Sequence, residues 1–255
     1  MRLRQVALIA RKIAPVADQL AAVFDIKDGF RDPGVEVFGL RNAVMPMGGE
    51  FLEVLEPMRD GTAGGRYLDR RGGDVGYMVI LHAGDALAER ARLEAMGVRV
   101  VATSPKGRYC FTHFHPADCA GVLLSIEGVE GDADWAAPMS EWPAAGPDWR
   151  QRAAPDLVGI SAVTLQSHDP LGACQRWCEL LGRGAVTAGD GLSIALDRGA
   201  IRFVAPIDDH GAGVVGFDIE VRDARAALER ARAAGLAVAG GAVEIGGVVI
   251  RPVSV

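Results

Sequence analysis

Apolar positions along this chain follow a helical period in some segments and run as short unbroken or alternating stretches in others, in an order that repeats. The apolar run of residues 5–10 predicts a strand, and the spacing of apolar residues within 16–24 predicts a helix. Residues 35–47 predict one or two further strands, and residues 51–55 predict another. The first unit is therefore a strand, a helix and then about three strands.

The same order returns three more times after a Gly- and Arg-rich connection at residues 60–74. Each later unit begins with an apolar strand, continues with a helix and ends with short strands. The predicted strands of the second, third and fourth units are 76–81, 98–102, 109–113 and 122–126; 160–166, 192–196 and 200–204; and 216–221, 236–239 and 248–253. Their predicted helices are 85–96, 170–181 and 223–234.

The helices of the second and fourth units match in detail. An aspartate that can cap a helix start, Asp85 or Asp223, stands twelve residues before a glycine that can end the helix, Gly97 or Gly235. Alanines and an arginine occur at the same offsets within both helices. The match, together with the flanking strands, indicates an internal duplication.

One such unit has a helix on one face of its sheet and leaves the other face bare. Two units side by side can curl their sheets into an open barrel, whose concave face is the usual place for a small ligand. We therefore predict an α+β fold of four βαβββ modules, paired into two open, mixed-sheet barrels with the helices outside. The predicted domains are 1–128 and 157–255.

Residues 129–156 form the predicted linker, since prolines break any regular pattern there. The segment also carries Trp135, Trp142 and Trp149, whose large rings usually bury against something. We therefore expect a connector pinned to the surface of one or both halves, rather than a free tether.

Composition narrows the classes of partner. The net charge of −6 and the pI near 5.4 argue against nucleic acid, and no apolar run is long enough to predict a membrane span. The four cysteines lack zinc-site spacing and predict reduced thiols, and the N-terminus lacks a signal-peptide pattern, so we expect a cytoplasmic protein. The expected partner is a small-molecule metabolite or drug-like ligand, and a homodimer is compatible with the sequence. The arginine group at residues 66–71 is either a solvated loop or a site for a small anion.

Four segments carry a family resemblance: FLEVLEP at 51–57, GYMV at 76–79, HPADCAGVLL at 115–124 and GLRNAV at 39–44. With the first three, the chain resembles the vicinal oxygen chelate superfamily, which includes glyoxalase I, methylmalonyl-CoA epimerase, extradiol dioxygenases and bleomycin-resistance proteins. The fourth, followed by residues 51–53, resembles the superfamily's glyoxalase-like group. The resemblance covers nearly all of residues 4–127 and is weaker over 159–255.

The resemblance implies where a divalent metal would be held. Metal-binding members place ligands on the first and last strands of each unit, which fall in the first barrel at Gln5, Glu53, Tyr77 and Ser125. Glu53 and Gln5 offer oxygens that suit a cation, whereas the tyrosine and the serine are poor ligands. A divalent metal is therefore an open question in the N-terminal barrel, and no cofactor is firmly implied.

The corresponding positions of the second barrel are Ala162, Arg202, Gly216 and Arg251. Two arginines bring positive charge to the place of a cation. We therefore expect no metal there, and a degenerate second barrel that supports the first.

Glu53 is the leading catalytic candidate, because a carboxylate among apolar neighbours is costly unless it has a function or a partner. It is either a base or metal ligand facing the barrel interior, or the partner of an arginine such as Arg41. His113 and Tyr77 are the candidate catalytic partners. The remaining candidates, expected to bind ligand, are Gln5, Asn42, Ser125 and Arg41.

Two other histidines have expected structural roles. His115 precedes Pro116 and is expected to bond local backbone in a turn, and His82 is expected to be exposed at a strand end.

Two functions remain open at this stage. The first is a lyase- or isomerase-type enzyme that abstracts a proton next to a carbonyl, with Glu53 as the base. The second is a non-catalytic protein that binds and sequesters a flat or hydrophobic compound. Ring-cleaving oxygenation ranks last, since the ligand positions lack two histidines and a carboxylate.

Overall fold

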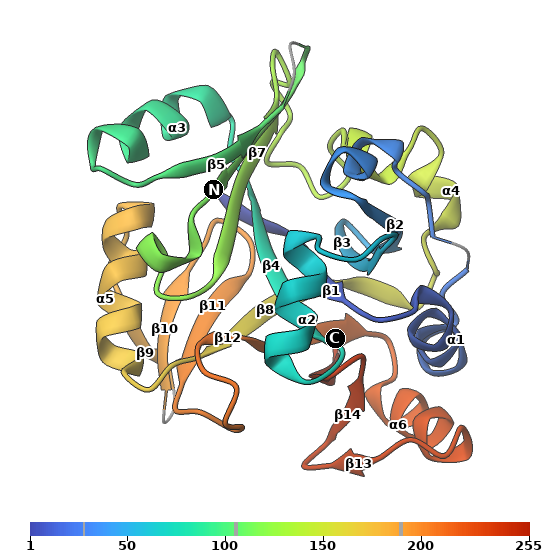
Figure 1. Cartoon of the computed structure of the whole chain (residues 1–255). Coiled ribbons are helices and arrows are strands. Elements are labelled where there is room, and N and C mark those ends of the chain that lie inside the picture. Colours follow the sequence, from blue (N-terminus) through green and yellow to red (C-terminus); the bar gives the residue numbers. More distant parts are fainter. Residues whose placement is uncertain (28, 105–106, 189–190) are drawn as a thin grey trace.

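A computed structural model describes residues 1–27, 29–104, 107–188 and 191–255. Two mixed sheets, one in each half of the chain, carry helices on their outer sides (Figure 1). The first sheet has the order β2-β3-β1-β4-β7-β6-β5. The elements of this half are β1 (Arg2–Ile9), α1 (Ile13–Phe24), η1 (Pro33–Phe38), β2 (Leu40–Met47), β3 (Glu50–Pro57), α2 (Ala63–Arg71), β4 (Val75–His82), α3 (Ala86–Ala95), β5 (Val100–Thr103), β6 (Tyr109–Phe114), η2 (Pro116–Asp118) and β7 (Leu123–Val129).

The second sheet has the order β13-β14-β15-β12-β8-β11-β10-β9. Between the halves lie two short helices, η3 (Pro143–Ala145) and α4 (Trp149–Arg152). The elements of the second half are β8 (Leu157–Gln166), α5 (Pro170–Leu181), β9 (Val186–Ala188), β10 (Gly191–Ala195), β11 (Ala200–Val204), β12 (Gly213–Val221), α6 (Ala224–Ala233), β13 (Val238–Ala239), β14 (Ala242–Ile245) and β15 (Val248–Ser254).

Each half pairs two modules through their first strands. Strand β1 runs antiparallel to β4, and β8 runs antiparallel to β12. Each of these strands is also parallel to the last strand of its own module, as β1 is to β3 and β4 is to β7. In the strand order of the first sheet, β2 and β5 remain at opposite edges, so this barrel is open. The predicted α+β fold of paired modules in two open barrels is confirmed.

Local sequence explains the helix ends. Asp85 accepts a hydrogen bond from the Ala88 amide at 2.8 Å, and Asp223 accepts one from the Ala226 amide at 2.9 Å. Both predicted caps, which start the matched helices α3 and α6, are confirmed. Gly97, with φ of +79°, follows the first of these helices in the left-handed conformation that favours glycine.

Two segments of the first half differ from prediction. Residues 35–47, predicted as one or two strands, form the single strand β2 only from residue 40 on, because Pro33 and the Asp32 cap start the 3₁₀ helix η1 ahead of it. The predicted connection at 60–74 contains helix α2, which Thr62 caps by accepting from the Gly65 amide at 2.9 Å. Its two glycines hid this helix from a propensity argument, and burial of Leu68 against the barrel stabilises it.

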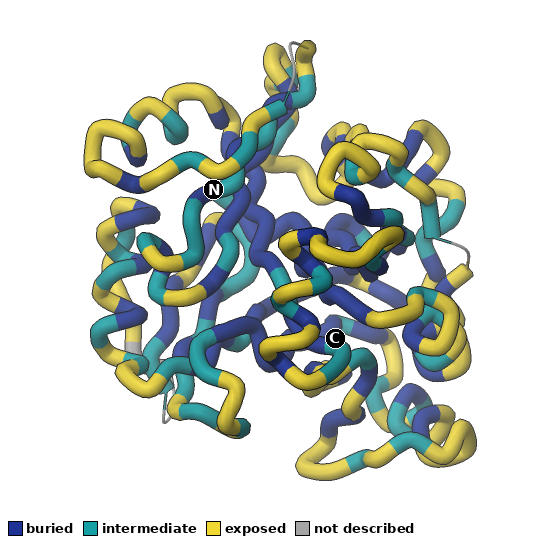
Figure 2. The backbone as a smooth tube through the Cα atoms, in the orientation of Figure 1, coloured by how far each residue is buried: buried dark blue, intermediate teal, exposed yellow. Residues whose placement is uncertain are grey.

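The buried apolar side chains of the described residues form two hydrophobic clusters. One lies between the sheets and the helices and joins both halves. The other fills the inner face of the N-terminal sheet, and its members include Phe51, Met78 and Ile80. Figure 2 shows the resulting pattern, with buried strands at the centre and exposed turns on the outer helices.

The linker contributes to the inner cluster. Trp142 and Trp149 are each only 1% exposed and pack against Phe51 inside the N-terminal barrel. Trp135 is half-buried. The expectation of a connector on the surface is therefore wrong for two of its three tryptophans, which close one end of the barrel. Among the residues described, no helix has the length and apolarity needed to cross a membrane.

Candidate functional site

Glu53 projects from β3 onto the inner face of the N-terminal barrel. It lies beside Ala7 of β1, and Gln5 of the same strand lies beside Phe51, so Glu53 and Gln5 share this face. Asn42 of β2 is on the same face, two residues from Val44, which pairs with Glu53. Glu53 is 6% exposed. The structure thus brings three of the predicted site residues together.

Two amides hold the Glu53 carboxylate. Gln5 Nε2 donates to Glu53 Oε2 at 2.8 Å, and Asn42 Nδ2 donates to Oε1 at 2.6 Å. The oxygen of each amide has its own donor: Trp142 Nε1 donates to Gln5 Oε1 at 2.9 Å, and the Asp32 amide donates to Asn42 Oδ1 at 2.9 Å. Because these last two groups can only donate, they fix which end of each amide faces Glu53.

Burial raises the pKa of Glu53 to about 7, against the opposing effect of the two amide hydrogen bonds, which favour the carboxylate. The nearby charge of Asp32 adds to the rise in pKa. A carboxyl group with this pKa exchanges a proton near neutral pH, as a general base must.

Glu127 of β7 is a second inner-face carboxyl, which the sequence analysis missed. It accepts hydrogen bonds from the Tyr109 hydroxyl and from Ser125 Oγ, the latter at 2.7 Å. Burial raises the pKa of Glu127 to about 7, and the charge of Glu53 contributes. The available signal was strand alternation, since a residue two positions after Ser125 faces the same side.

Ser125 therefore has a different place from the one expected. It is fully buried and donates to Glu127 rather than lining an accessible surface. Its position between β4 and β6 makes it a support for that carboxyl group.

Two tyrosines supply neutral hydroxyl groups. Burial raises the pKa of Tyr77 to about 12, with the charges of Tyr67 and Glu53 adding to it. The Tyr77 ring packs edge-on against Tyr67 of α2, with ring centroids 5.4 Å apart. Burial also raises the pKa of Tyr109, which lies against Glu127. Both phenols stay protonated at neutral pH, and the Tyr109 hydroxyl donates to Glu127.

His113 of β6 also faces the barrel interior, because it pairs with Ser125 of β7. Its ring lies 4.7 Å from Phe111 and 5.7 Å from Phe38 of η1, centroid to centroid. Burial lowers the pKa of His113 to about 4, so the ring is neutral at pH 7. In the sheet order, β1, β4 and β7 lie between the His113 strand β6 and the Glu53 strand β3.

Arg41 does not belong to this site. It projects from β2 to the outer face, where it pairs with Glu56 at 2.6 Å. Glu56 also binds Lys12 at 2.9 Å and the Ile13 amide at 3.0 Å, which ties β3 to the start of α1. The expectation that Arg41 pairs with Glu53 or binds ligand beside it is therefore replaced by a structural role.

The other histidines divide between a confirmed role and a correction. His115 accepts a hydrogen bond from the Ala117 amide at 3.2 Å, as expected for a turn residue. His82, expected to be exposed, is fully buried at the linker end of the barrel, 5.0 Å from Trp142 between ring centroids. Burial lowers its pKa to about 3.

The arginine group at 66–71 lies on α2. Arg71 is buried and donates to backbone carbonyls of the second half, including that of Gly211 at 3.1 Å. Arg70 is exposed, with its guanidinium 5.8 Å from the Tyr67 ring centroid. Arg71 thus joins the halves, whereas Arg70 lies beside Tyr67 of the same helix.

Burial varies over the inner face of the N-terminal barrel. Trp142 is 1% exposed, whereas several other inner-face side chains are only half-buried. These half-buried side chains are Tyr77, Tyr109, Phe111, His113 and Leu123. Two surface pockets, of about 600 and 360 Å³, lie outside this face, one between the halves beside Asp118 and Arg176 and one beside Arg59.

The inner-face residues do not fit the divalent metal that the resemblance implies. Both oxygens of Glu53 meet amide N–H groups, which repel a cation, and Gln5 turns its oxygen to the Trp142 indole. Among the residues described, no three His, Cys, Asp or Glu side chains gather in a metal-binding group. In the second barrel Arg202 pairs with Asp218 at 2.6 Å, which places a guanidinium at a family ligand position.

We therefore expect purified protein to contain far less than one equivalent of zinc, manganese or iron by elemental analysis. Dialysis against EDTA should leave the Tm unchanged. If a metal were bound, with its free concentration at a thousand times its Kd, it would stabilise the fold by about 4 kcal/mol, and its removal would lower the Tm. Stoichiometric metal that is lost in Glu53→Gln would contradict this donor-set argument.

Comparisons with known proteins place this geometry in a fold class. Neither protein-family models nor curated proteins gave a match. Among solved structures, a hypothetical protein from Staphylococcus aureus is similar over 100% of this chain and 99% of its own, with a TM-score of 0.67 and 12% identity. A triple mutant of 4-hydroxymandelate synthase from Streptomyces coelicolor is similar over 92% of this chain and 75% of its own, with a TM-score of 0.65 and 16% identity.

A variant of methylmalonyl-CoA epimerase from Streptomyces coelicolor matches only 51% of this chain, with 97% of its own length covered, a TM-score of 0.46 and 22% identity. The matches along the whole chain, together with the module topology, show that this protein has the two-barrel fold of these structures, which is the fold that the resemblance to the vicinal oxygen chelate superfamily implied. At these identities the likeness defines the fold and leaves the reaction to the site.

Proposed function

We propose that the N-terminal barrel is the active site of an isomerase- or lyase-type enzyme that moves a proton at a carbon next to a carbonyl group. One observation carries the proposal. Two buried carboxyl groups, Glu53 and Glu127, share the inner face, and the pKa of each is raised to about 7. Near neutral pH each group can gain or lose a proton, so that one can serve as base while the other serves as acid.

Glu53 takes the substrate proton in this scheme. Its carboxylate removes the hydrogen, and the electron pair of the C–H bond moves to form an enolate whose negative charge lies on the carbonyl oxygen. A neutral Tyr77 hydroxyl, close enough to Glu53 for the carboxylate to raise the phenol pKa, donates a hydrogen bond to that oxygen. Protonated Glu127 then returns a proton to carbon, and solvent restores the starting protonation states.

His113 has a lesser role in this scheme. Because its ring is neutral at pH 7 and stacks beside Phe111, it forms part of the aromatic wall rather than the acid–base pair. Gln5 and Asn42 orient Glu53, and Ser125 orients Glu127.

The proposal is tested by incubating the protein in D₂O with a panel of small 2-oxo acids, malonyl-type acids and thioesters, and following exchange at the α-carbon by ¹H NMR. We expect exchange with a bell-shaped dependence of kcat/KM on pH, centred near 7. Below that pH Glu53 becomes protonated and loses its function as base, and above it Glu127 ionises and loses its function as acid. A rate that rises steadily through pH 9 would count against this pair.

Sequestration of a flat compound is the second candidate, and the aromatic inner face favours it. Phe38, Tyr77, Tyr109, Phe111 and His113 provide ring surfaces on or beside this face. A flat aromatic that raises the Tm equally in wild type and Glu53→Gln, without exchange of any panel compound, would support binding without turnover.

A further inference from the structure

The linker reaches into the proposed site through Trp142. Its Nε1 donates to Gln5 Oε1 at 2.9 Å, and Gln5 Nε2 donates to Glu53 Oε2 at 2.8 Å. An indole N–H can only donate, so the atom that faces it must be the amide oxygen. The Gln5 amide therefore has one orientation, with its NH₂ group toward Glu53.

We propose that Trp142 is a positioning residue for Glu53, and that the linker is thereby a component of the N-terminal site. Trp142 fixes the Gln5 amide, and the amide in turn presents an N–H donor to the carboxylate. The consequence for turnover rests on the proposed function, but the orientation of the amide and its effect on the proton affinity of Glu53 do not.

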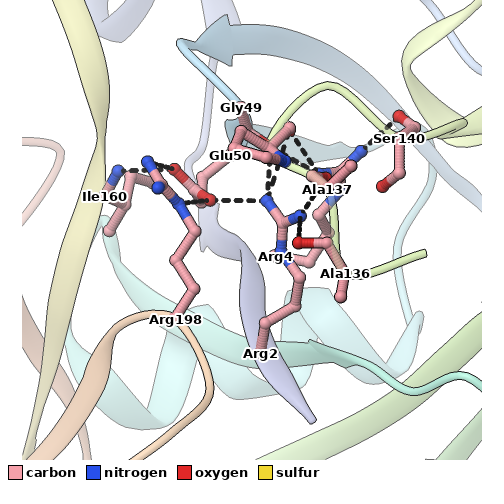
Figure 3. Close-up of polar contacts among 10 residues, drawn as sticks. Arg2, Arg4, Gly49, Glu50, Ala136, Ala137, Ser140, Ile160 and Arg198 are labelled. Atoms are coloured by element: carbon pink, nitrogen blue, oxygen red, sulfur yellow. Dashed lines mark hydrogen bonds and ion pairs between the residues drawn. The ribbon is translucent and has the colours of Figure 1, made fainter. Parts of the chain in front are cut away.

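Two buried arginines hold the linker where Trp142 can donate to Gln5 (Figure 3). Arg4 Nη1 donates to the Pro138 carbonyl at 3.1 Å, and Nη2 donates to the Ser140 carbonyl at 2.7 Å. Arg2 donates to the carbonyls of neighbouring linker residues, as Figure 3 shows. The Arg4 guanidinium also lies 5.1 Å from the Trp142 ring centroid. These contacts fix the backbone on the N-terminal side of Trp142.

Ring packing fixes the side chain itself. The Trp142 ring stacks on Phe51 at 6.2 Å and meets Tyr109 edge-on at 5.8 Å, centroid to centroid. Phe51 precedes Glu53 on the same face of β3. The Trp142 ring therefore contacts the same strand that carries Glu53, the residue to which the Gln5 amide donates. The indole N–H is therefore aimed at Gln5 by contacts on both sides of the ring.

Losing the indole N–H changes what Gln5 offers to Glu53. A freed amide can turn its oxygen toward the carboxyl group, which stabilises the protonated form by accepting its O–H. Asn42, Asp32, Glu127 and Tyr77 also act on Glu53 or feel its charge, and this substitution leaves them in place. The pKa of Glu53 is then expected to rise.

Trp142→Phe is the test, and Trp149→Phe is its matched control. Both tryptophans belong to the linker, are 1% exposed and pack on Phe51, but only Trp142 donates to Gln5. Carboxyl-¹³C glutamate labelling gives the pKa of Glu53 by NMR, and the resonance is assigned by its loss in Glu53→Gln. We expect Trp142→Phe to raise this pKa by about one pH unit, a tenfold change in proton affinity, and Trp149→Phe to leave it unchanged.

A double-mutant cycle distinguishes an effect of Trp142 that passes through the Gln5 amide from a general loosening of the linker. In a Gln5→Met background, Trp142→Phe should produce no further rise in the pKa of Glu53. An equal rise in both backgrounds, or equal effects of the two tryptophan variants, would overturn the proposal.

Should Trp142→Phe fail to fold, the indole ¹H–¹⁵N resonance of Trp142 must still shift upfield in Gln5→Met. A resonance that does not move would also overturn the proposal. None of these measurements requires turnover, so absence of catalysis leaves the result intact.

Discussion

Glu53→Gln is expected to lower the rate of α-proton exchange by about 10²- to 10⁴-fold, the contribution of a positioned general base. Glutamine keeps the size of the side chain but cannot take a proton, and its NH₂ group meets one of the two amide donors that hold the Glu53 carboxylate. The loss should appear in kcat, because the substrate still meets the same aromatic wall. Quenched exchange assays in D₂O, at saturating substrate and pH 7, measure this loss of kcat directly.

The matched control is Glu56→Gln, three residues further along the same strand. Its side chain lies on the outer face with Arg41 and Lys12, so exchange should stay near the wild-type rate. Glu127→Gln removes the acid, so exchange at pH 7 should also fall, and the decline of kcat/KM above pH 7 that Glu127 causes should disappear. A Glu53→Gln variant that retains exchange within about twofold of wild type would exclude Glu53 as the base.

How much of this site was predictable follows from which contacts are local. Glu53 stood out because its neighbours on the strand are apolar, and alternation then placed it on the inner face. The cost of a lone buried carboxylate predicted a partner for it. The nearest arginine, Arg41, was the wrong choice, since its offset from Asn42 by one residue turns it to the other side of β2.

Glu127 and Trp142 were missed for two other reasons. The first was obscured by reliance on a family ligand position at Ser125, two residues away on the same face. The second is 137 positions from Gln5, and nothing in its local sequence specifies that the indole enters the barrel. Composition predicted that the linker tryptophans bury against something, but only the assembled sheet specifies the surface that receives them.

The fold was predicted further than the site, because repetition provides evidence that a single segment cannot. The matching helices α3 and α6 share caps, length and flanking strands, so each supports the assignment of the other. Elements outside the repeat, such as η1 and α2, lacked that support and were missed. Their stability comes from caps and from burial against the barrel, and burial depends on tertiary structure that a local pattern does not reveal.

Glu50→Gln is expected to reduce the free energy of unfolding by about 3–5 kcal/mol, the usual cost of removing one partner of a buried ion pair. Glu50 is fully buried and binds Arg2 at 2.7 Å, Arg198 at 2.6 Å and the Ile160 amide at 3.3 Å (Figure 3). Arg198 and Ile160 belong to the second half, so one carboxylate joins the halves. Glutamine removes the negative charge and leaves Arg2, which is 1% exposed, without a counterion.

Urea unfolding monitored by tryptophan fluorescence measures this loss, with Glu56→Gln as the control. Glu56 is also buried, but the side chains of its partners Lys12 and Arg41 are 70% and 43% exposed, so its removal should cost about 1 kcal/mol. Arg198→Met should fall between the two, because Glu50 then keeps Arg2 while the guanidinium that is lost was already 32% exposed. If Glu50→Gln and Glu56→Gln proved equally mild, the buried charges around Glu50 would contribute no more than a surface pair. The two halves would then be held together by their shared hydrophobic cluster alone.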